Sequence, residues 1–288
     1  MTVPWRAAPD TVADLGHSPE DSGVAAIADL LARHRLSGTA LTTLPDRLLP
    51  VGPGIIDLVL LAMLRRLPWA PAGWKVGAAS DEVQRMEGLL GPVPGRLYRD
   101  RLFPAGTALG RSEFINHRNT ECEFAFVLRR SLPARDEPYS RDEVDDAIGD
   151  LVPVLEVGDS VFPDWYGSSK FFGPCLDNGG GSAIILGEAF DDWRKVDLAA
   201  APIAVYLNGE HVRTGHGRLA MGHPVASVTW LVNWTSSYGI DLRAGELISS
   251  GTCTSHTFAA PGDEVRADFG AFGEVRVQYL KLDAAPAQ

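Results

Sequence analysis

The sequence predicts an α+β fold in which a β-rich core follows a small helical N-terminal segment. The first 70 residues carry apolar side chains at helical spacing, whereas residues 71–288 contain mostly short apolar segments of strand character. These segments do not alternate regularly with helices, which disfavours a doubly wound parallel sheet. The Pro- and Gly-rich stretch 67–73 separates the two patterns. We therefore predict a helical N-terminal segment at 1–70 and a β-rich domain at 71–288.

Two helices are predicted in the N-terminal segment. Residues 22–38 place apolar side chains three and four positions apart, with Ser22 as a candidate N-cap and Gly38 as the stop. Residues 55–67 are apolar over most of their length, which indicates a buried helix.

The remaining elements follow from periodicity, capping residues and turn residues. Ser80 is a candidate N-cap, Ser140 and Glu143 match a capping box, and Asn208–Gly209 suits the type I′ turn of a hairpin. The predicted strands are 73–80, 121–128, 153–162, 182–188, 203–207, 210–215, 246–252, 263–269 and 274–282, and the further helices are 80–91, 140–151 and 223–239.

Composition and charge argue against several classes of function. The formal net charge is −11 and there is no dense Lys/Arg patch, so we expect no nucleic-acid partner. The three cysteines are too scattered for a disulfide framework or a zinc site, and a reducing cytoplasm is the expected location. The most hydrophobic run, 55–64, is shorter than the about 20 residues that span a membrane. The N-terminus lacks the pattern of a signal peptide.

Two glutamates, Glu121 and Glu123, open the apolar segment ECEFAFVL. On a strand they point to one face, roughly 6.5–7 Å apart along the chain, where their charges repel unless a cation lies between them. Glu156 is a third acid in an apolar strand. Three carboxylates without a His/Cys pattern suit Mg²⁺ or Mn²⁺. The alternative is that the first two lie at a solvated strand end and that Glu156 pairs with an arginine.

Lys75 lies inside the short, Gly-flanked segment GWKVG, so we expect its side chain to point inward. A buried lysine needs an anionic partner or a depressed pKa, and either suits a catalytic site. The alternative is a lysine that extends to solvent from a strand end.

Taken in order, these segments resemble the fumarylacetoacetate hydrolase superfamily, and within it the branch of 2-oxopent-4-enoate hydratases and 4-oxalocrotonate decarboxylases. The resemblance covers most of the chain. It is carried by GWKVGAAS, ECEFAFVL, PVLEVGDS, LDNGGG, LNGEHVRTGHG, HPVASVTWLVNW and LISSGTCTS.

The resemblance implies a fumarylacetoacetate-hydrolase-like core, a metal-dependent activity and a set of site residues. It implies a lyase that binds Mg²⁺ or Mn²⁺ and acts on a 2-oxo or 2-hydroxydienoic acid, with hydration preferred over decarboxylation, and a homodimer or larger homo-oligomer. By position, the implied metal ligands are Glu121, Glu123 and Glu156, the catalytic residues are Lys75 and Asp159, and the substrate-binding residues are Ser160, Asn178 (paired with Asp177), Gly251 and Thr252.

Two departures from the family pattern leave the reaction open. Val93 stands where the hydratases usually carry an aspartate, and Val161 stands where they usually carry an arginine. Decarboxylation, acylpyruvate-type C–C hydrolysis, or a non-catalytic role as partner of a sister enzyme therefore remain alternatives. His256 is a candidate for the edge of the pocket. Trp165 is expected to serve in packing, with a cap over an aromatic or alkyl substrate tail as the alternative, and Cys122 is expected in the core.

Overall fold

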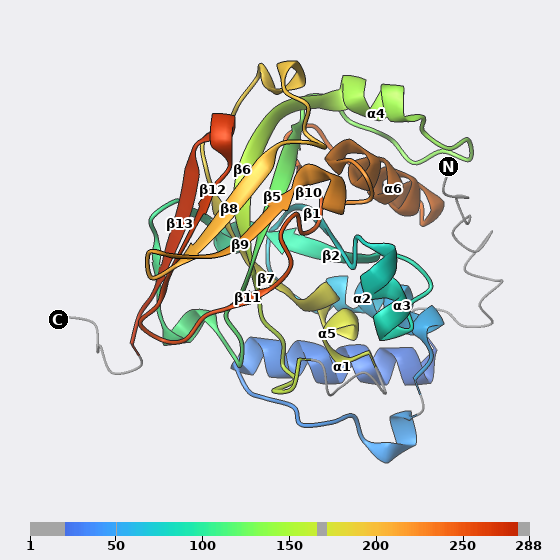
Figure 1. Ribbon diagram of the computed structural model, residues 1–288. Coiled ribbons are helices and arrows are strands. Elements are labelled where there is room, and N and C mark those ends of the chain that lie inside the picture. Colours follow the sequence, from blue (N-terminus) through green and yellow to red (C-terminus); the bar gives the residue numbers. More distant parts are fainter. Residues whose placement is uncertain (1–20, 50, 166–171, 282–288) are drawn as a thin grey trace.

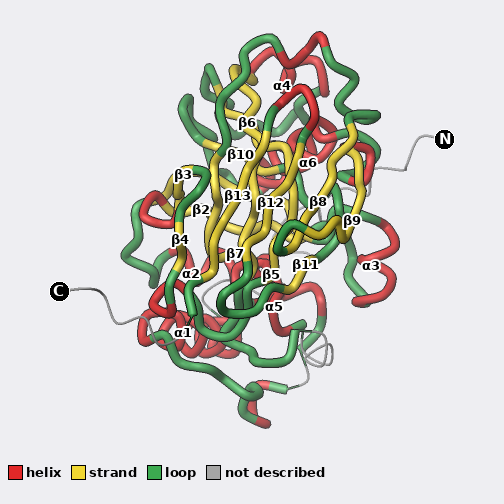
Figure 2. The backbone as a smooth tube through the Cα atoms, turned by 60° about the vertical axis from the view of Figure 1, so that its left-hand side comes forward, coloured by secondary structure: helices red, strands yellow, loops and turns green. Residues whose placement is uncertain are grey.

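The protein is represented by a computed structural model that describes residues 21–49, 51–165 and 172–281. Its strands form an eight-stranded and a five-stranded sheet. In the larger sheet the order is β2-β1-β10-β5-β6-β7-β3, with β11 paired to β5, and in the smaller it is β4-β13-β12-β8-β9. Figure 2 shows the strands of both sheets side by side, with α1, α2 and α5 at one end and α4 at the other. The α+β prediction is confirmed.

The larger sheet contains β1 (Pro71–Gly77), β2 (Val93–Tyr98), β3 (Leu102–Pro104), β5 (Asn119–Leu128), β6 (Ile148–Gly158), β7 (Gly181–Leu186), β10 (Leu247–Ser249) and β11 (Thr257–Phe258). The smaller sheet contains β4 (Ala108–Leu109), β8 (Pro202–Leu207), β9 (Glu210–His216), β12 (Glu264–Asp268) and β13 (Glu274–Tyr279). The α-helices are α1 (Ser22–Ser37), α2 (Ile56–Leu64), α3 (Asp81–Glu87), α4 (Arg141–Ala147), α5 (Gly173–Leu176) and α6 (Pro224–Ser237).

The alternating side chains of β5 serve two different cores. Phe124 and Phe126 belong to the main core, where the ring of Phe124 contacts Phe269 and Phe272 beside the smaller sheet. Ala125, on the opposite face, packs in a separate apolar cluster with residues of β6 and β7. The predicted two-faced pattern of this strand is therefore confirmed, and Glu121 and Glu123 share the face of Ala125.

The helical segment packs directly against the β-rich region. Helix α1 lies across the lower end of the molecule in Figure 1, and α2 contacts both α1 and β2. The apolar residues of α1 and α2 share one core with Val93, Val161 and Leu176. The half-buried carboxylate of Asp57 accepts hydrogen bonds from Trp234 Nε1 at 2.9 Å and from the Tyr238 hydroxyl at 3.2 Å. The division near residue 70 stays a prediction.

Several element boundaries differ from the predictions. The N-cap of α1 is Asp21, whose carboxylate accepts from the backbone N–H of Gly23, and the prediction of Ser22 is wrong. Helix α4 keeps its predicted capping box but ends at Ala147, because Ile148 adopts extended backbone and pairs with Leu128. Strand β6 correspondingly starts earlier than predicted and ends at Gly158.

Other local predictions are confirmed. Gly38 ends α1 with a φ of 63°, and Ser80 caps α3 by accepting from the backbone N–H of Val83. Asn208 and Gly209 both have positive φ between β8 and β9, as a type I′ turn requires. Within the described part of the chain, no helix is long and apolar enough to cross a membrane.

Candidate functional site

The register of β5 against β6 brings three carboxylates together. The strands pair antiparallel, with Glu121 opposite Glu156 and Glu123 opposite Val154. Residues opposite each other in an antiparallel pair point to the same face, and so do residues two apart on one strand. All three glutamates therefore face one cavity, and each of them lines it.

Lys75 reaches the same cavity from β1. Its ammonium lies 3.2 Å from Glu156 Oε1 and donates a hydrogen bond to the backbone carbonyl of Gly179. The lysine residue is only 4% exposed. Burial lowers its pKa, but the charges of Glu156, Glu121 and Glu123 outweigh that effect and raise the pKa above its ordinary value. The inward orientation is confirmed, and the lysine is a fixed cation with an anionic partner.

Glycines make room for the stem of this lysine. Gly95 pairs with Lys75 across β2, and a Cβ at Gly95 would lie 2.8 Å from Lys75 Cε. A Cβ at Gly181 would lie 3.1 Å from the same atom. A larger residue at Gly95 or Gly181 would therefore take the space that the Lys75 side chain occupies.

Glu123 is almost fully buried and firmly held. Its Oε2 accepts from the Ser249 hydroxyl and, at 3.0 Å, from the backbone N–H of Gly251. Burial, followed by the charges of Glu156 and Glu121, raises its pKa well above the usual range. Burial likewise raises the pKa of Glu156, against the opposing effect of Lys75. These carboxyl groups are thus placed where a cation would relieve their repulsion.

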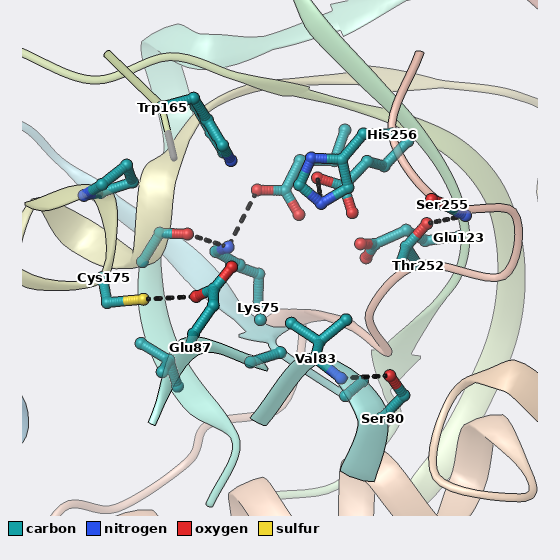
Figure 3. A pocket seen from close by; sticks show the side chains of 18 of the residues that line it. Lys75, Ser80, Val83, Glu87, Glu123, Trp165, Cys175, Thr252, Ser255 and His256 are labelled. Carbon is teal, nitrogen blue, oxygen red and sulfur yellow. Dashed lines mark hydrogen bonds and ion pairs between the residues drawn. The ribbon is translucent and has the colours of Figure 1, made fainter. Parts of the chain in front are cut away.

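The cavity has a volume of about 400 Å³ and a mixed lining. Figure 3 shows Lys75, Glu123 and Thr252 around it together with Trp165, His256 and Glu87. His256 Nε2 lies 3.7 Å from Glu121 Oε1, and its ring makes an edge contact with Trp165. The prediction that His256 edges the pocket is confirmed. Trp165 lines the cavity as well, so its position fits the alternative of a cap over the substrate better than packing alone.

Asp159 and Ser160 are not among the described residues that line the cavity, and direct roles for them stay a prediction. The Asp159 carboxylate accepts from the backbone N–H groups of Ile115, Asn116 and His117 at 2.5, 3.0 and 2.6 Å, which fixes the segment before β5. The Ser160 hydroxyl donates to Asp177 Oδ2 at 2.9 Å.

Asn178 and Gly251 act one step behind the cavity wall. Asn178 Oδ1 accepts from the backbone N–H of Arg96, and its Nδ2 donates to the Arg96 carbonyl at 3.1 Å, so it holds the turn that carries Gly179. The backbone N–H of Gly251 donates a hydrogen bond to Glu123 Oε2. Asn178 and Gly251 thus support residues of the cavity wall, whereas Thr252 itself lines the cavity, and substrate binding by all three stays a prediction.

The two departures from the family pattern have different surroundings. Val93 lines the cavity as an apolar wall residue. Val161 is buried in the core shared with α1 and α2, and its N–H donates to Asp177 Oδ2 at 2.7 Å. Asp177 pairs with Arg35 of α1, whose guanidinium contacts the Asp177 carboxylate and donates to the Asp177 carbonyl at 2.9 Å.

Sequence reasoning missed Arg35 and Glu87. Arg35 lies 142 positions from Asp177, and nothing local distinguishes it from the other basic residues of its helix. Glu87 is the last residue of α3 and lines the cavity. The one available signal was an acid in the last helical turn, where acidic residues are unfavourable.

The three glutamates have the chemistry of a site for a hard divalent cation, because they offer several carboxylate oxygens on one face. However, no three His, Cys, Asp or Glu side chains of the described residues already stand in the arrangement of a metal site. Glu156 is drawn toward Lys75, and Glu123 toward Ser249. The predicted ligands share one cavity, and their binding of a metal stays a prediction.

Comparison with known proteins identifies relatives with this fold. A 2-keto-4-pentenoate hydratase of Paraburkholderia xenovorans (strain LB400) is 33% identical over 207 residues, which are 72% of this chain and 75% of the relative. A 4-oxalocrotonate decarboxylase of Pseudomonas putida is 27% identical over 208 residues, 72% of this chain and 77% of the relative. The solved 4-oxalocrotonate decarboxylase from Pseudomonas putida G7, complexed with magnesium and adipate, superposes with a TM-score of 0.79 at 25% identity, covering 89% of this chain and 97% of that one.

The family described as "Fumarylacetoacetate (FAA) hydrolase C-terminal" matches residues 99–279, which include Glu121, Glu123 and Glu156. The chain therefore belongs to the fumarylacetoacetate hydrolase family.

Proposed function

We propose that the protein is a divalent-metal-dependent hydratase of the 2-keto-4-pentenoate type. The observation that carries the proposal is the β5–β6 register, which sets Glu121 opposite Glu156 with the Lys75 ammonium 3.2 Å from Glu156. The relatives named as 2-keto-4-pentenoate hydratases and the metal-complexed structural neighbour support it.

In this proposal Glu121, Glu123 and Glu156 hold Mg²⁺ or Mn²⁺. The bound cation would supply Lewis-acid stabilisation of negative charge on the carboxylate and C2 oxygen of the substrate. Lys75 lies beside Glu156 with its ammonium inside the cavity, so it is placed to serve as a cation and proton donor. Its ammonium can pair with the substrate carboxylate or deliver a proton into the cavity.

Decarboxylation of a 4-oxalocrotonate-type acid is the second candidate, favoured by the structural similarity to the solved decarboxylase. Both reactions start from a 2-oxo or 2-hydroxydienoic acid, so the product distinguishes them. A cytoplasmic location, a homo-oligomeric state, and a role in breakdown of aromatic compounds remain predictions.

The first test is turnover of 2-hydroxypenta-2,4-dienoate with Mg²⁺, followed by loss of diene absorbance and by the mass of the product. Metal-dependent formation of a product heavier by one water supports the hydratase, and loss of CO₂ from 4-oxalocrotonate supports the second candidate. Glu123→Gln and EDTA should each remove activity, whereas the exposed control Glu188→Gln should not. Lys75→Met should lower kcat by at least about a hundredfold while calorimetry still detects Mg²⁺ binding.

Metal binding by the wild type without turnover of either acid would overturn both candidates. It would favour a different oxo acid or a non-catalytic role beside a sister enzyme. Absence of metal binding would overturn the assignment of Glu121, Glu123 and Glu156 as ligands.

A further inference from the structure

Glu87 places a carboxyl group in the cavity on a different element from the three glutamates of β5 and β6. It is the last residue of α3, which Gly88 ends with a φ of 67°. Figure 3 shows Glu87 and Glu123 on different sides of the cavity. The thiol of Cys175 donates to Glu87 Oε2 at 3.4 Å. Burial raises the pKa of this thiol, so it stays protonated and remains a donor that fixes the carboxyl group.

Nothing in the stability of α3 explains an acid at this position. The C-terminus of a helix carries partial negative charge, so a carboxylate there is repelled. Burial, the largest effect, raises the pKa of Glu87, and the charge of Glu121 raises it further, against the thiol of Cys175 and the charges of His256 and Lys75. A carboxyl group kept in an unfavourable place inside a cavity is typical of a functional residue.

The cations of the described cavity lining are already engaged. Lys75 pairs with Glu156 and donates to the Gly179 carbonyl, and His256 lies beside Glu121. No other lysine, arginine or histidine is among the described residues that line the cavity. Among the described lining residues, a second carboxylate on a ligand would therefore meet Glu87 where Lys75 and His256 already lie beside other glutamates.

We propose that Glu87 makes this site selective for 2-oxo acids whose far end carries no carboxylate. The inference rests on the proposed function, because it assumes that the 2-oxo acid end binds at Glu121, Glu123, Glu156 and Lys75. Of the compounds named for the relatives, 2-keto-4-pentenoate carries one carboxylate and 4-oxalocrotonate carries two. Glu87 thus favours the hydratase substrate over the decarboxylase substrate.

The test uses two saturated ligands that differ only at the far end, 2-oxohexanoate and 2-oxoadipate. Neither contains the diene that hydration requires, so their affinities report binding separately from turnover. Their dissociation constants are measured by calorimetry with Mg²⁺ for the wild type and for Glu87→Gln, which keeps an acceptor for the Cys175 thiol. Glu87→Leu is the second variant, and Asp81→Asn is the matched control, since Asp81 is an exposed acid on the same helix.

We expect the wild type and Asp81→Asn to bind 2-oxohexanoate about tenfold or more tightly than 2-oxoadipate. Both Glu87 variants should lose most of that preference through tighter binding of 2-oxoadipate, with circular dichroism confirming that they fold. Equal binding of the two ligands by the wild type, or an undiminished preference in both Glu87 variants, overturns the inference and leaves the proposed function standing. Failure of the wild type to bind either ligand with Mg²⁺ overturns the proposed function together with the inference.

Discussion

Replacing Arg35 by methionine should destabilise the whole molecule, because this side chain joins α1 to the turn behind Lys75. The Arg35 and Asp177 side chains are 6% and 0% exposed, and the guanidinium also donates to the backbone carbonyls of Asp159 and Asp177. The Asp177 carbonyl in turn accepts from the backbone N–H of Gly180, next to the carbonyl that holds Lys75.

The size of the loss follows from the charge left behind. Removing one partner of a buried ion pair costs about 3–5 kcal/mol, because the other charge stays buried. Asp177 keeps the Ser160 hydroxyl and the Val161 N–H as donors, so we expect the lower end, about 3 kcal/mol. The double variant Arg35→Met/Asp177→Asn should lose much less than the sum of the two single changes, because no charge is then left unpaired.

Urea denaturation followed by circular dichroism measures these free energies, provided the slope against urea is unchanged. The matched control is Arg66→Met, which breaks an Arg–Asp pair with Asp29 whose side chains are 25% and 52% exposed. An exposed pair contributes about 0–1 kcal/mol, so this control should change little. A loss below about 1 kcal/mol for Arg35→Met, or additive losses in the double variant, would refute the reasoning.

Three further predictions concern single positions. Burial raises the pKa of Asp57, so the folded state loses stability as pH rises through that pKa. The variant Asp57→Asn keeps an acceptor oxygen and should raise Tm increasingly from pH 4 to pH 8. A difference in Tm that does not depend on pH would contradict this. Gly251 has a φ of 91°, and a Cβ there would lie 2.7 Å from the Val76 carbonyl oxygen. Gly251→Ala should therefore lower the free energy of unfolding in urea by about 1–3 kcal/mol, and it should lower turnover because Glu123 loses the Gly251 N–H. Unchanged kinetics would argue against the supporting role of Gly251. The backbone N–H of the N-cap residue Ser140 holds the pKa of Glu143 to about 2. The contribution of Glu143 to stability is therefore present above its ordinary pKa and is lost as pH falls through about 2. NMR titration measures the pKa of Glu143 directly, and an ordinary value would disprove the capping box.

The sequence was most informative where a structural feature depends on neighbouring residues. The type I′ turn at Asn208–Gly209, the cap at Ser80 and the two faces of the strand 119–128 were all predictable, because backbone conformation and side-chain alternation are local properties. Boundaries were less predictable. Helix α4 ends at Ala147 because the following residues pair with β5, and that competition involves a partner distant in the chain.

The residues of the candidate site divide in the same way. Glu121, Glu123, Glu156 and Lys75 stand out in the sequence because charged side chains in apolar strands are rare without partners. Asp159 stands out for the same reason, yet the structure turns its carboxylate toward backbone N–H groups and away from the cavity. The pattern of residue types indicates which charges are buried, but it does not indicate what each one faces.

The sequence by itself therefore determined the class of fold, the family resemblance and the set of buried charges. Only the tertiary structure decided that Glu121 faces Glu156, that Arg35 supplies the cation at Asp177, and that Glu87 enters the cavity. The physical reason is that strand register and helix docking are set by the sum of many contacts between distant segments, so no single stretch of sequence contains them.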